Sequence, residues 1–124
     1  MSEDSNTPCR ILLVDDSRVA RLTLQHLLSK ATDRELAIQE AANGDEALTL
    51  FTPASFDLVL IDFNMPGIDG LELATILNGL QPDLRMALIT ANIQDSIVER
   101  ATKLGMVFLG KPVTLEQLST LIRG

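Results

Sequence analysis

Strand-length apolar runs alternate with segments of helical periodicity along most of this chain. Between the runs, apolar residues recur every three or four positions, as in Val19–Leu28. Strict alternation of strand and helix predicts parallel strands joined by helical crossovers. The runs 11–14 and 58–61 are apolar throughout, which is typical of strands covered on both faces. The pattern predicts a doubly wound α/β fold with a five-stranded parallel sheet and five helices.

The element boundaries follow from caps, turns and breaks in the periodicity. The expected strands are residues 11–14, 36–41, 58–61, 86–91 and 107–109. The expected helices are residues 19–31, 46–51, 71–80, 94–104 and a last one from the capping residue Thr114 to about residue 122. Asn43-Gly44 is predicted to form a turn before the second helix.

Length and termini predict one domain, residues 10–124, after a disordered tail, residues 1–9. The opening segment is acidic and polar, unlike a secretory signal. Cys9 is the single cysteine, so no intramolecular disulfide can form. That is compatible with the reducing cytoplasm, which is the location we expect.

Charge and composition exclude two classes of function. The net charge of −7 argues against direct nucleic-acid binding, which needs a basic surface. The chain has four Phe but no Trp or Tyr, so aromatic platforms for bases are scarce. No apolar stretch approaches the length of a membrane span, so we expect no membrane insertion.

Polar side chains follow four of the predicted strands. Asp15 and Asp16 follow the first strand, Asp62 follows the third, Thr90 lies near the end of the fourth, and Lys111 comes shortly after the fifth. Because parallel strands of like sense end at one edge of the sheet, these side chains should converge. Three acids alone would repel one another and be pushed toward protonation. A divalent cation and the lysine would relieve that conflict and leave one carboxylate able to attack an electrophile.

Five motifs, in order and in register, give the chain from Arg10 to Arg123 a resemblance to the receiver domain of two-component response regulators. They are Leu13–Ser17, Ala41–Leu48, Asp57–Gly70, Thr90-Ala91 and Lys111-Pro112. The resemblance implies a flavodoxin-like receiver fold and a role in phosphorelay signal transduction.

The resemblance also implies a role for each matching residue. Asp62 would be the phosphoacceptor of this phosphoprotein. Asp16 would hold Mg²⁺ directly, Asp15 through water, and Asn64 through its backbone carbonyl, and Asp62 would belong to the same set of metal ligands.

Thr90 and Lys111 would contact the phosphoryl oxygens in the same scheme. Phe108 occupies the switch-aromatic position, so Thr90 and Phe108 would move together after phosphorylation and remodel the surface that binds partners.

The chain contains neither of the glycine-rich nucleotide cradles, G-x-x-x-x-G-K-[ST] and G-x-G-x-x-G, so no nucleotide cofactor is expected. The expected phosphoryl donors are a histidine kinase, a histidine phosphotransfer protein or a small acyl phosphate. No motif identifies the downstream protein target. Relatives of this kind include phosphorylation-dependent dimers.

Because the resemblance is to a signalling module, we expect a switch rather than a turnover enzyme.

Two alternatives remain at this point. A small Mg²⁺-dependent phosphatase of the haloacid-dehalogenase type also uses a strand-end aspartate, but it needs a second acid where this chain has Asn64. A receiver-like scaffold that no longer takes phosphate is the other. Taken singly, each site residue has a plainer interpretation, such as helix capping for Asp15 and Asp16. Asn92 could tune phosphoryl hydrolysis or be an ordinary turn residue, and His26 and Cys9 are assigned no role.

Overall fold

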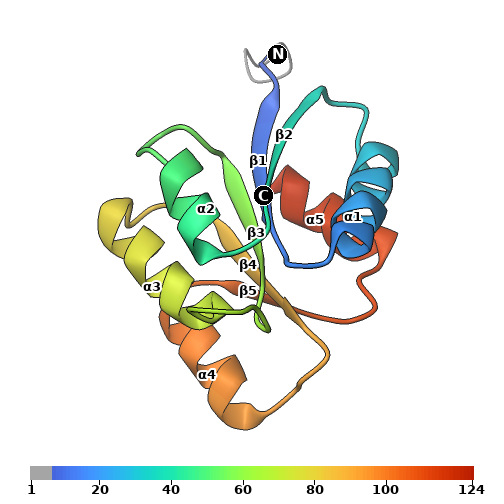
Figure 1. Ribbon diagram of the computed structural model, residues 1–124. Coiled ribbons are helices and arrows are strands. Elements are labelled where there is room, and N and C mark those ends of the chain that lie inside the picture. The colour runs from blue at the N-terminus through green and yellow to red at the C-terminus, as the bar shows by residue number, and fades with distance from the viewer. Residues whose placement is uncertain (1–6) are drawn as a thin grey trace.

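Five strands form one parallel sheet in the order β2-β1-β3-β4-β5 (Figure 1). The computed structural model describes residues 7–124. Every neighbouring pair of strands is parallel, which confirms the predicted α/β fold. The strands are β1 (Cys9–Val14), β2 (Leu36–Ala41), β3 (Leu58–Asp62), β4 (Met86–Thr90) and β5 (Val107–Gly110).

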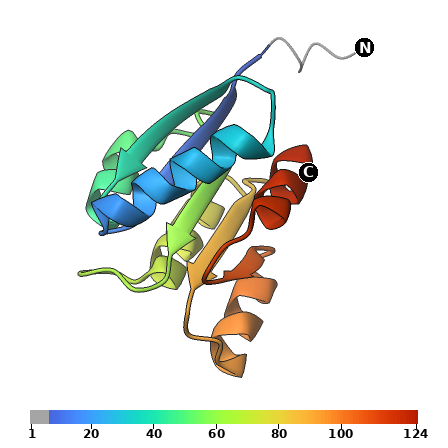
Figure 2. The ribbon, with the colours of Figure 1, turned by 90° about the vertical axis from the view of Figure 1, so that its right-hand side faces the viewer.

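Helices cover both faces of the sheet (Figures 1 and 2). They are α1 (Arg18–Ala31), α2 (Gly44–Leu50), α3 (Gly70–Leu80), α4 (Asp95–Lys103) and α5 (Leu115–Arg123). Helices α1 and α5 lie side by side on one face, and α2, α3 and α4 cover the other. Within residues 7–124, no helix combines the length and the hydrophobicity needed to cross a membrane.

Successive residues of the central strands belong to two separate apolar clusters. In β3, Leu58 and Leu60 pack in the cluster under α1 and α5, whereas Val59 and Ile61 pack in the cluster under α2, α3 and α4. All four side chains are at most 1% exposed. Side chains alternate across a strand, so a strand buried on both faces must be apolar at every position. This is why run 58–61 carries no polar alternation.

Side-chain caps set where most of the helices begin. Asp69 with Glu72, and Thr114 with Gln117, form capping boxes at α3 and α5, as the sequence predicted for α5. The second helix begins at Gly44, two residues before the expected start at Glu46, so Gly44 belongs to the helix rather than to the predicted turn. Asn43 caps α2 by accepting a hydrogen bond from the backbone N–H of Glu46.

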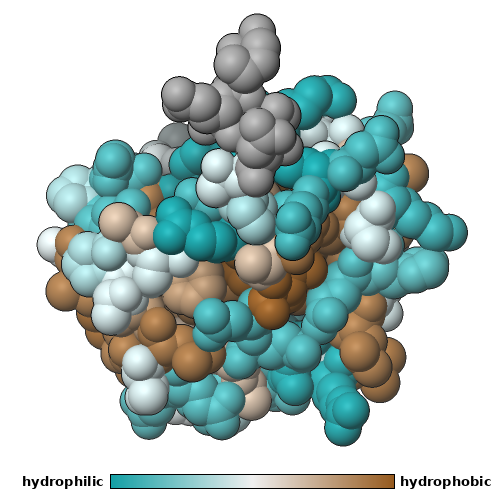
Figure 3. All heavy atoms as spheres, turned by 90° about the horizontal axis from the view of Figure 1, so that it is seen from above, coloured by the Kyte–Doolittle hydropathy of each residue, from teal (hydrophilic) through white to brown (hydrophobic). Residues whose placement is uncertain are grey.

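The predicted tail is too long by at least one residue. Cys9 is the first residue of β1 and is 2% exposed, and burial raises the pKa of its thiol. Residues 1–6 of the predicted tail lie outside the described residues. Beside Cys9, Arg10 binds Asp57 through its backbone N–H and two guanidinium nitrogens, which ties the start of β1 to the turn before β3. At this end of the molecule hydrophilic residues break up the apolar surface (Figure 3).

The opposite end of the sheet depends on a close approach between β3 and α3. Gly70, the first residue of α3, donates its backbone N–H to the carbonyl of Phe63 at 3.0 Å. A Cβ atom at Gly70 would lie 2.5 Å from the backbone oxygen of Asp62. Only glycine therefore lets α3 begin this close to the end of β3.

We expect Gly70→Ala to destabilise the fold by about 1–3 kcal/mol, because backbone atoms must move to admit the methyl group. Gly79→Ala is the matched control on the same helix, where an added Cβ meets nothing within 4 Å. Since alanine has the higher helix propensity, Gly79→Ala should gain up to about 1 kcal/mol. Urea unfolding of both variants tests this, and equal changes in the two would refute the steric argument.

Candidate functional site

Three aspartates meet where the chain order of the sheet reverses. Strands β1 and β3 are neighbours, with Val14 opposite Ile61. Asp15 and Asp16 follow β1, and Asp62 is the last residue of β3. One carboxylate oxygen from each aspartate lies within 4.8 Å of the others. The predicted convergence of these side chains is confirmed, and it falls at the switch point where open α/β sheets bind ligands.

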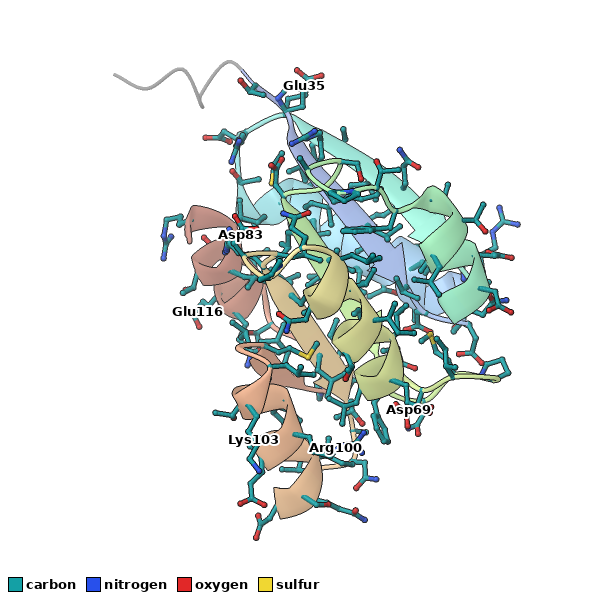
Figure 4. All side chains as sticks on the ribbon, turned by 90° about the vertical axis from the view of Figure 1, so that its left-hand side faces the viewer. Glu35, Asp69, Asp83, Arg100, Lys103 and Glu116 are labelled. Atoms are coloured by element: carbon teal, nitrogen blue, oxygen red, sulfur yellow. The ribbon has the colours of Figure 1, made fainter. Side chains whose placement is uncertain are left out.

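Lys111 reaches the same cluster from the end of β5. Its Nζ lies 3.0 Å from Oδ1 of Asp62 and 4.0 Å from Oδ2 of Asp15. The backbone N–H of Lys111 donates to the carbonyl of Thr90 at 3.0 Å, which continues the pairing of β4 with β5, and the peptide bond from Lys111 to Pro112 is cis. Two other cations, Arg100 and Lys103, project from α4 (Figure 4). Within residues 7–124, Lys111 is the only cation that forms an ion pair with the carboxylate of Asp15 or Asp62.

Burial and like charge leave Asp62 poorly compensated. Asp15 is 3% exposed and Asp62 is 4% exposed. Burial raises the pKa of Asp62, and the charges on Asp15 and Asp16 add to that effect, while the hydrogen bond from Lys111 opposes it. The pKa of Asp62 is raised overall, so the positive charge of Lys111 alone does not offset burial and the neighbouring negative charges. A divalent cation with a preference for carboxylate oxygen fits this donor set.

Asp15 is held in place by the turn that follows β1. Its Oδ1 accepts a hydrogen bond from the backbone N–H of Ser17 at 2.8 Å. The Ser17 side chain in turn accepts from the backbone N–H of Ala20 and caps α1. The N-cap of α1 is therefore Ser17, so the interpretation of Asp15 and Asp16 as helix caps was wrong, and Asp15 contributes to this turn as well as to the acidic cluster.

The other predicted site residues lie around the cluster in different environments. Thr90 ends β4, is fully buried, and its hydroxyl accepts from the backbone N–H of Asn92 at 2.9 Å. Phe108 is half-buried in β5 beside Leu88 and packs against the apolar cluster under α2, α3 and α4. Asn64 is exposed in the β3–α3 loop.

Open hollows flank the acidic cluster. One, of about 330 Å³, is lined by Asp16, Phe63, Asn64, Met65 and Asp69, the residue that Figure 4 shows at the start of α3. A second, of about 410 Å³, is mainly apolar and has Asp15 and Lys111 at its edge. The cluster is therefore reachable from outside, although two of its carboxylates are buried.

Sequence reasoning missed Arg21, whose guanidinium contacts the backbone of Asp15. Nothing in the spacing marks an arginine in the first turn of a helix as part of a site, because its partner is a carbonyl rather than a side chain. The sequence left open whether Asn92 lies near the phosphoryl group. In the structure, the backbone N–H of Asn92 donates a hydrogen bond to the hydroxyl of Thr90.

Comparison with known proteins agrees with this geometry. The sequence model of the response regulator receiver domain matches residues 11–123. The chain belongs to that family.

Curated relatives with similar sequences include response regulators and a phosphotransferase. The chain is 34% identical to the positive alginate biosynthesis regulatory protein of Pseudomonas aeruginosa, over 91% of this chain and 45% of that protein. It is 37% identical to the response regulator MprA of Mycolicibacterium vanbaalenii, over 94% and 49%. It is 28% identical to sporulation initiation phosphotransferase F of Bacillus subtilis, over 92% and 90%. The chain thus spans about half the length of the first two relatives and nearly all of the third.

Solved structures share the fold. The chemotaxis response regulator CheY4 of Vibrio cholerae has a TM-score of 0.80 at 27% identity, covering 94% of this chain and 98% of that one. The non-phosphorylated HemR receiver domain of Leptospira biflexa has a TM-score of 0.81 at 30% identity, covering 94% and 92%. The receiver fold predicted from the motifs is confirmed.

We expect Asp62→Asn to raise the stability of the metal-free protein at neutral pH. The folded-state pKa of Asp62 lies above its value in the unfolded chain. The group therefore favours folding below its unfolded pKa, and this contribution is lost as pH rises through the folded-state pKa. Replacing the ionised carboxylate should gain on the order of 1 kcal/mol, or roughly 4 °C in Tm. Thermal unfolding in EDTA measures the gain, and Mg²⁺ should stabilise the wild type more than the variant.

Asp57→Asn is the matched control, because it makes the same substitution at the other end of β3. Partial burial of Asp57 would raise its pKa, but hydrogen bonds from Arg10 lower it overall. Its stabilisation is present above the unfolded pKa and lost as pH falls through the folded value. Asp57→Asn should therefore lower Tm at neutral pH, by a small amount because the pair is partly exposed. If both variants shifted Tm in the same direction, the charge argument would fail.

Proposed function

We propose that Asp62 accepts a phosphoryl group from a phosphohistidine on a histidine kinase or a histidine phosphotransfer protein, and that this chain is a switch rather than a turnover enzyme. The observation that carries the proposal is the buried Asp62 carboxylate, 3.0 Å from Lys111 and within 4.8 Å of two further carboxylates. Membership of the receiver family supports the same role.

Mg²⁺ is the proposed cofactor. Asp16 would hold it directly, Asp15 through water, and Asn64 through its backbone carbonyl, and Asp62 would complete the ligand set, as predicted from the sequence. The donor set is all oxygen, which suits a hard divalent cation. When bound, the ion supplies positive charge that lets an anionic phosphoryl group approach anionic carboxylates.

The residues of the chain itself carry the transfer. An Asp62 oxygen attacks phosphorus, the phosphorus–nitrogen bond of the donor breaks, and its electron pair returns to the imidazole. Lys111 is already paired with Asp62 and can follow the phosphoryl oxygens as charge moves onto them. Thr90, whose hydroxyl accepts a hydrogen bond from the backbone N–H of Asn92, would donate its hydroxyl proton to a phosphoryl oxygen on Asp62. Positioning and charge compensation supply most of the catalysis in such transfers.

Phosphorylation would act through Thr90 and Phe108. The group on Asp62 gains charge and acceptor oxygens, which draw the Thr90 hydroxyl toward it. Phe108 then turns into the space that Thr90 leaves. The surface formed by α4, β5 and α5 changes, and with it the binding of a downstream protein or of a second copy of the chain. The downstream target and the cytoplasmic location remain predictions.

The phosphatase alternative lacks one group in its mechanism. The position two residues after Asp62, where such enzymes have a general acid, is Asn64. An amide cannot protonate a leaving alkoxide, so steady hydrolysis of phosphomonoesters is not expected. The same acids and Lys111 argue against a scaffold that takes no phosphate.

Acetyl phosphate and Mg²⁺ should label the protein with one phosphoryl group, as measured by intact mass spectrometry. Asp62→Asn should abolish the labelling, and Lys111→Ala should slow it by about tenfold or more, because a charge that follows the phosphoryl group is lost. Asp57→Asn, which lies far from the cluster, should label at the wild-type rate. Steady release of phosphate from phosphomonoesters without labelling of Asp62 would instead support the phosphatase.

The switch predicts a specific pattern of chemical-shift changes. Addition of beryllofluoride and Mg²⁺ should shift backbone amide signals along residues 90–115, since this range holds Thr90, α4 and Phe108 in β5. Thr90→Ala should bind the mimic yet lose most of the shifts beyond the acceptor site. Changes confined to the loop after Asp62 would refute the coupling.

A further inference from the structure

Arg21 connects three parts of the fold at the edge of the acidic cluster. Its Nη1 donates to the backbone carbonyl of Asp15 at 2.5 Å, and its Nε donates to the carboxylate of Glu40 at 2.7 Å. Arg21 belongs to α1, Asp15 follows β1, and Glu40 lies in β2. The Arg21 side chain is only 14% exposed, so the guanidinium sits within the structure rather than in solvent.

We propose that Arg21 is a positioning residue for Asp16, acting through the peptide bond between Asp15 and Asp16, and that Glu40 is the counter-ion that makes this cation tolerable beside a metal site. The inference rests on the proposed function, in which Asp16 binds Mg²⁺ directly.

The peptide geometry explains how the contact acts. The carbonyl of Asp15 is part of a planar unit that ends at the Cα atom of Asp16. A guanidinium that holds this carbonyl therefore fixes the plane from which the Asp16 side chain leaves. Within residues 7–124, the Asp16 carboxylate has no hydrogen bond or ion pair, and the residue is exposed. Its backbone is thus what orients it before a cation arrives.

Glu40 compensates the positive charge of Arg21. A permanent positive charge beside a cation site would weaken cation binding if it were alone. The hydrogen bond from Arg21 lowers the pKa of Glu40, which keeps that carboxylate ionised at neutral pH. The Arg21–Glu40 pair then places almost no net charge beside the cluster, while the Nε and Nη1 donors of the guanidinium remain hydrogen-bonded. Lysine could not replace this contact, because a single ammonium lacks the fork that bridges two acceptors.

Mg²⁺ titration followed by amide chemical shifts tests the proposal. Arg21→Ala should raise the Mg²⁺ Kd by about tenfold, as expected when a group that orients a metal ligand is lost. Arg18→Ala is the matched control, since it removes the same charge from the same turn of α1, and Arg18 is exposed without a hydrogen bond to Asp15. On charge alone, both substitutions should tighten Mg²⁺ binding. A Kd for Arg21→Ala equal to or below the wild-type value would overturn the proposal.

A double-mutant cycle tests the part played by Glu40. Glu40→Gln should weaken Mg²⁺ binding by a few fold, and Arg21→Ala/Glu40→Gln should bind no more weakly than Arg21→Ala alone. Losses that simply multiply would show that Glu40 acts on the ion by itself and would overturn its role as counter-ion.

Stability measurements separate positioning from a merely structural role. A structural loss would lower Tm equally in EDTA and in Mg²⁺, whereas positioning predicts a smaller Mg²⁺-induced rise in Tm for Arg21→Ala. If that variant fails to fold, Arg21→Lys keeps the charge and should still raise the Kd several fold. Failure of the wild type to bind Mg²⁺ would refute the proposed function itself, while wild-type binding with unchanged variants would refute only the role of Arg21.

Discussion

The crowding of three carboxylates at the end of β1 and β3 is the constraint on which the site depends. Asp15 and Asp62 are buried beside each other, and burial together with like charge raises the pKa of Asp62. A fold built only for stability would not keep such a group. Lys111 offsets part of the repulsion at 3.0 Å and leaves the remainder for a cation. The site thus holds unbalanced negative charge, which the proposed Mg²⁺ ion would compensate.

The rest of the fold supports this arrangement from the backbone. Gly70 lets α3 begin against the carbonyl of Asp62, and the Asp15–Ser17 turn starts α1 directly after β1. The Arg21 contact adds a third backbone constraint next to Asp16. Main-chain contacts therefore hold Asp15 and the backbone around the cluster, whereas the Asp62 carboxylate itself is paired with the Lys111 side chain.

Much of the fold and the site could be predicted from the sequence because both rest on short-range patterns. Continuous apolar runs such as 58–61 predicted doubly covered strands, and the acids at the ends of β1 and β3 predicted one shared edge. Each wrong or missing prediction has a physical cause. Asn43-Gly44 was assigned to a turn because its dipeptide is ambiguous between turn and cap, and Cys9 was assigned to the tail because pairing with β2 is a long-range contact. Arg21 went unnoticed because its acceptors are a carbonyl and the distant Glu40.

The sequence by itself determined the alternation of elements, the apolar surfaces they bury and the identity of the acids and the lysine, since periodicity and residue chemistry are local properties. Only the tertiary structure decided how far the carboxylates are buried, which of them Lys111 meets, and that Arg21 contacts the carbonyl of Asp15. Burial and side-chain pairing depend on which strand ends become neighbours in the sheet. The Arg21 contact depends on a backbone carbonyl, a group that every residue has and that no sequence pattern marks. The charge balance at Asp62, on which the proposed chemistry rests, exists only once β1, β3 and β5 lie in one sheet.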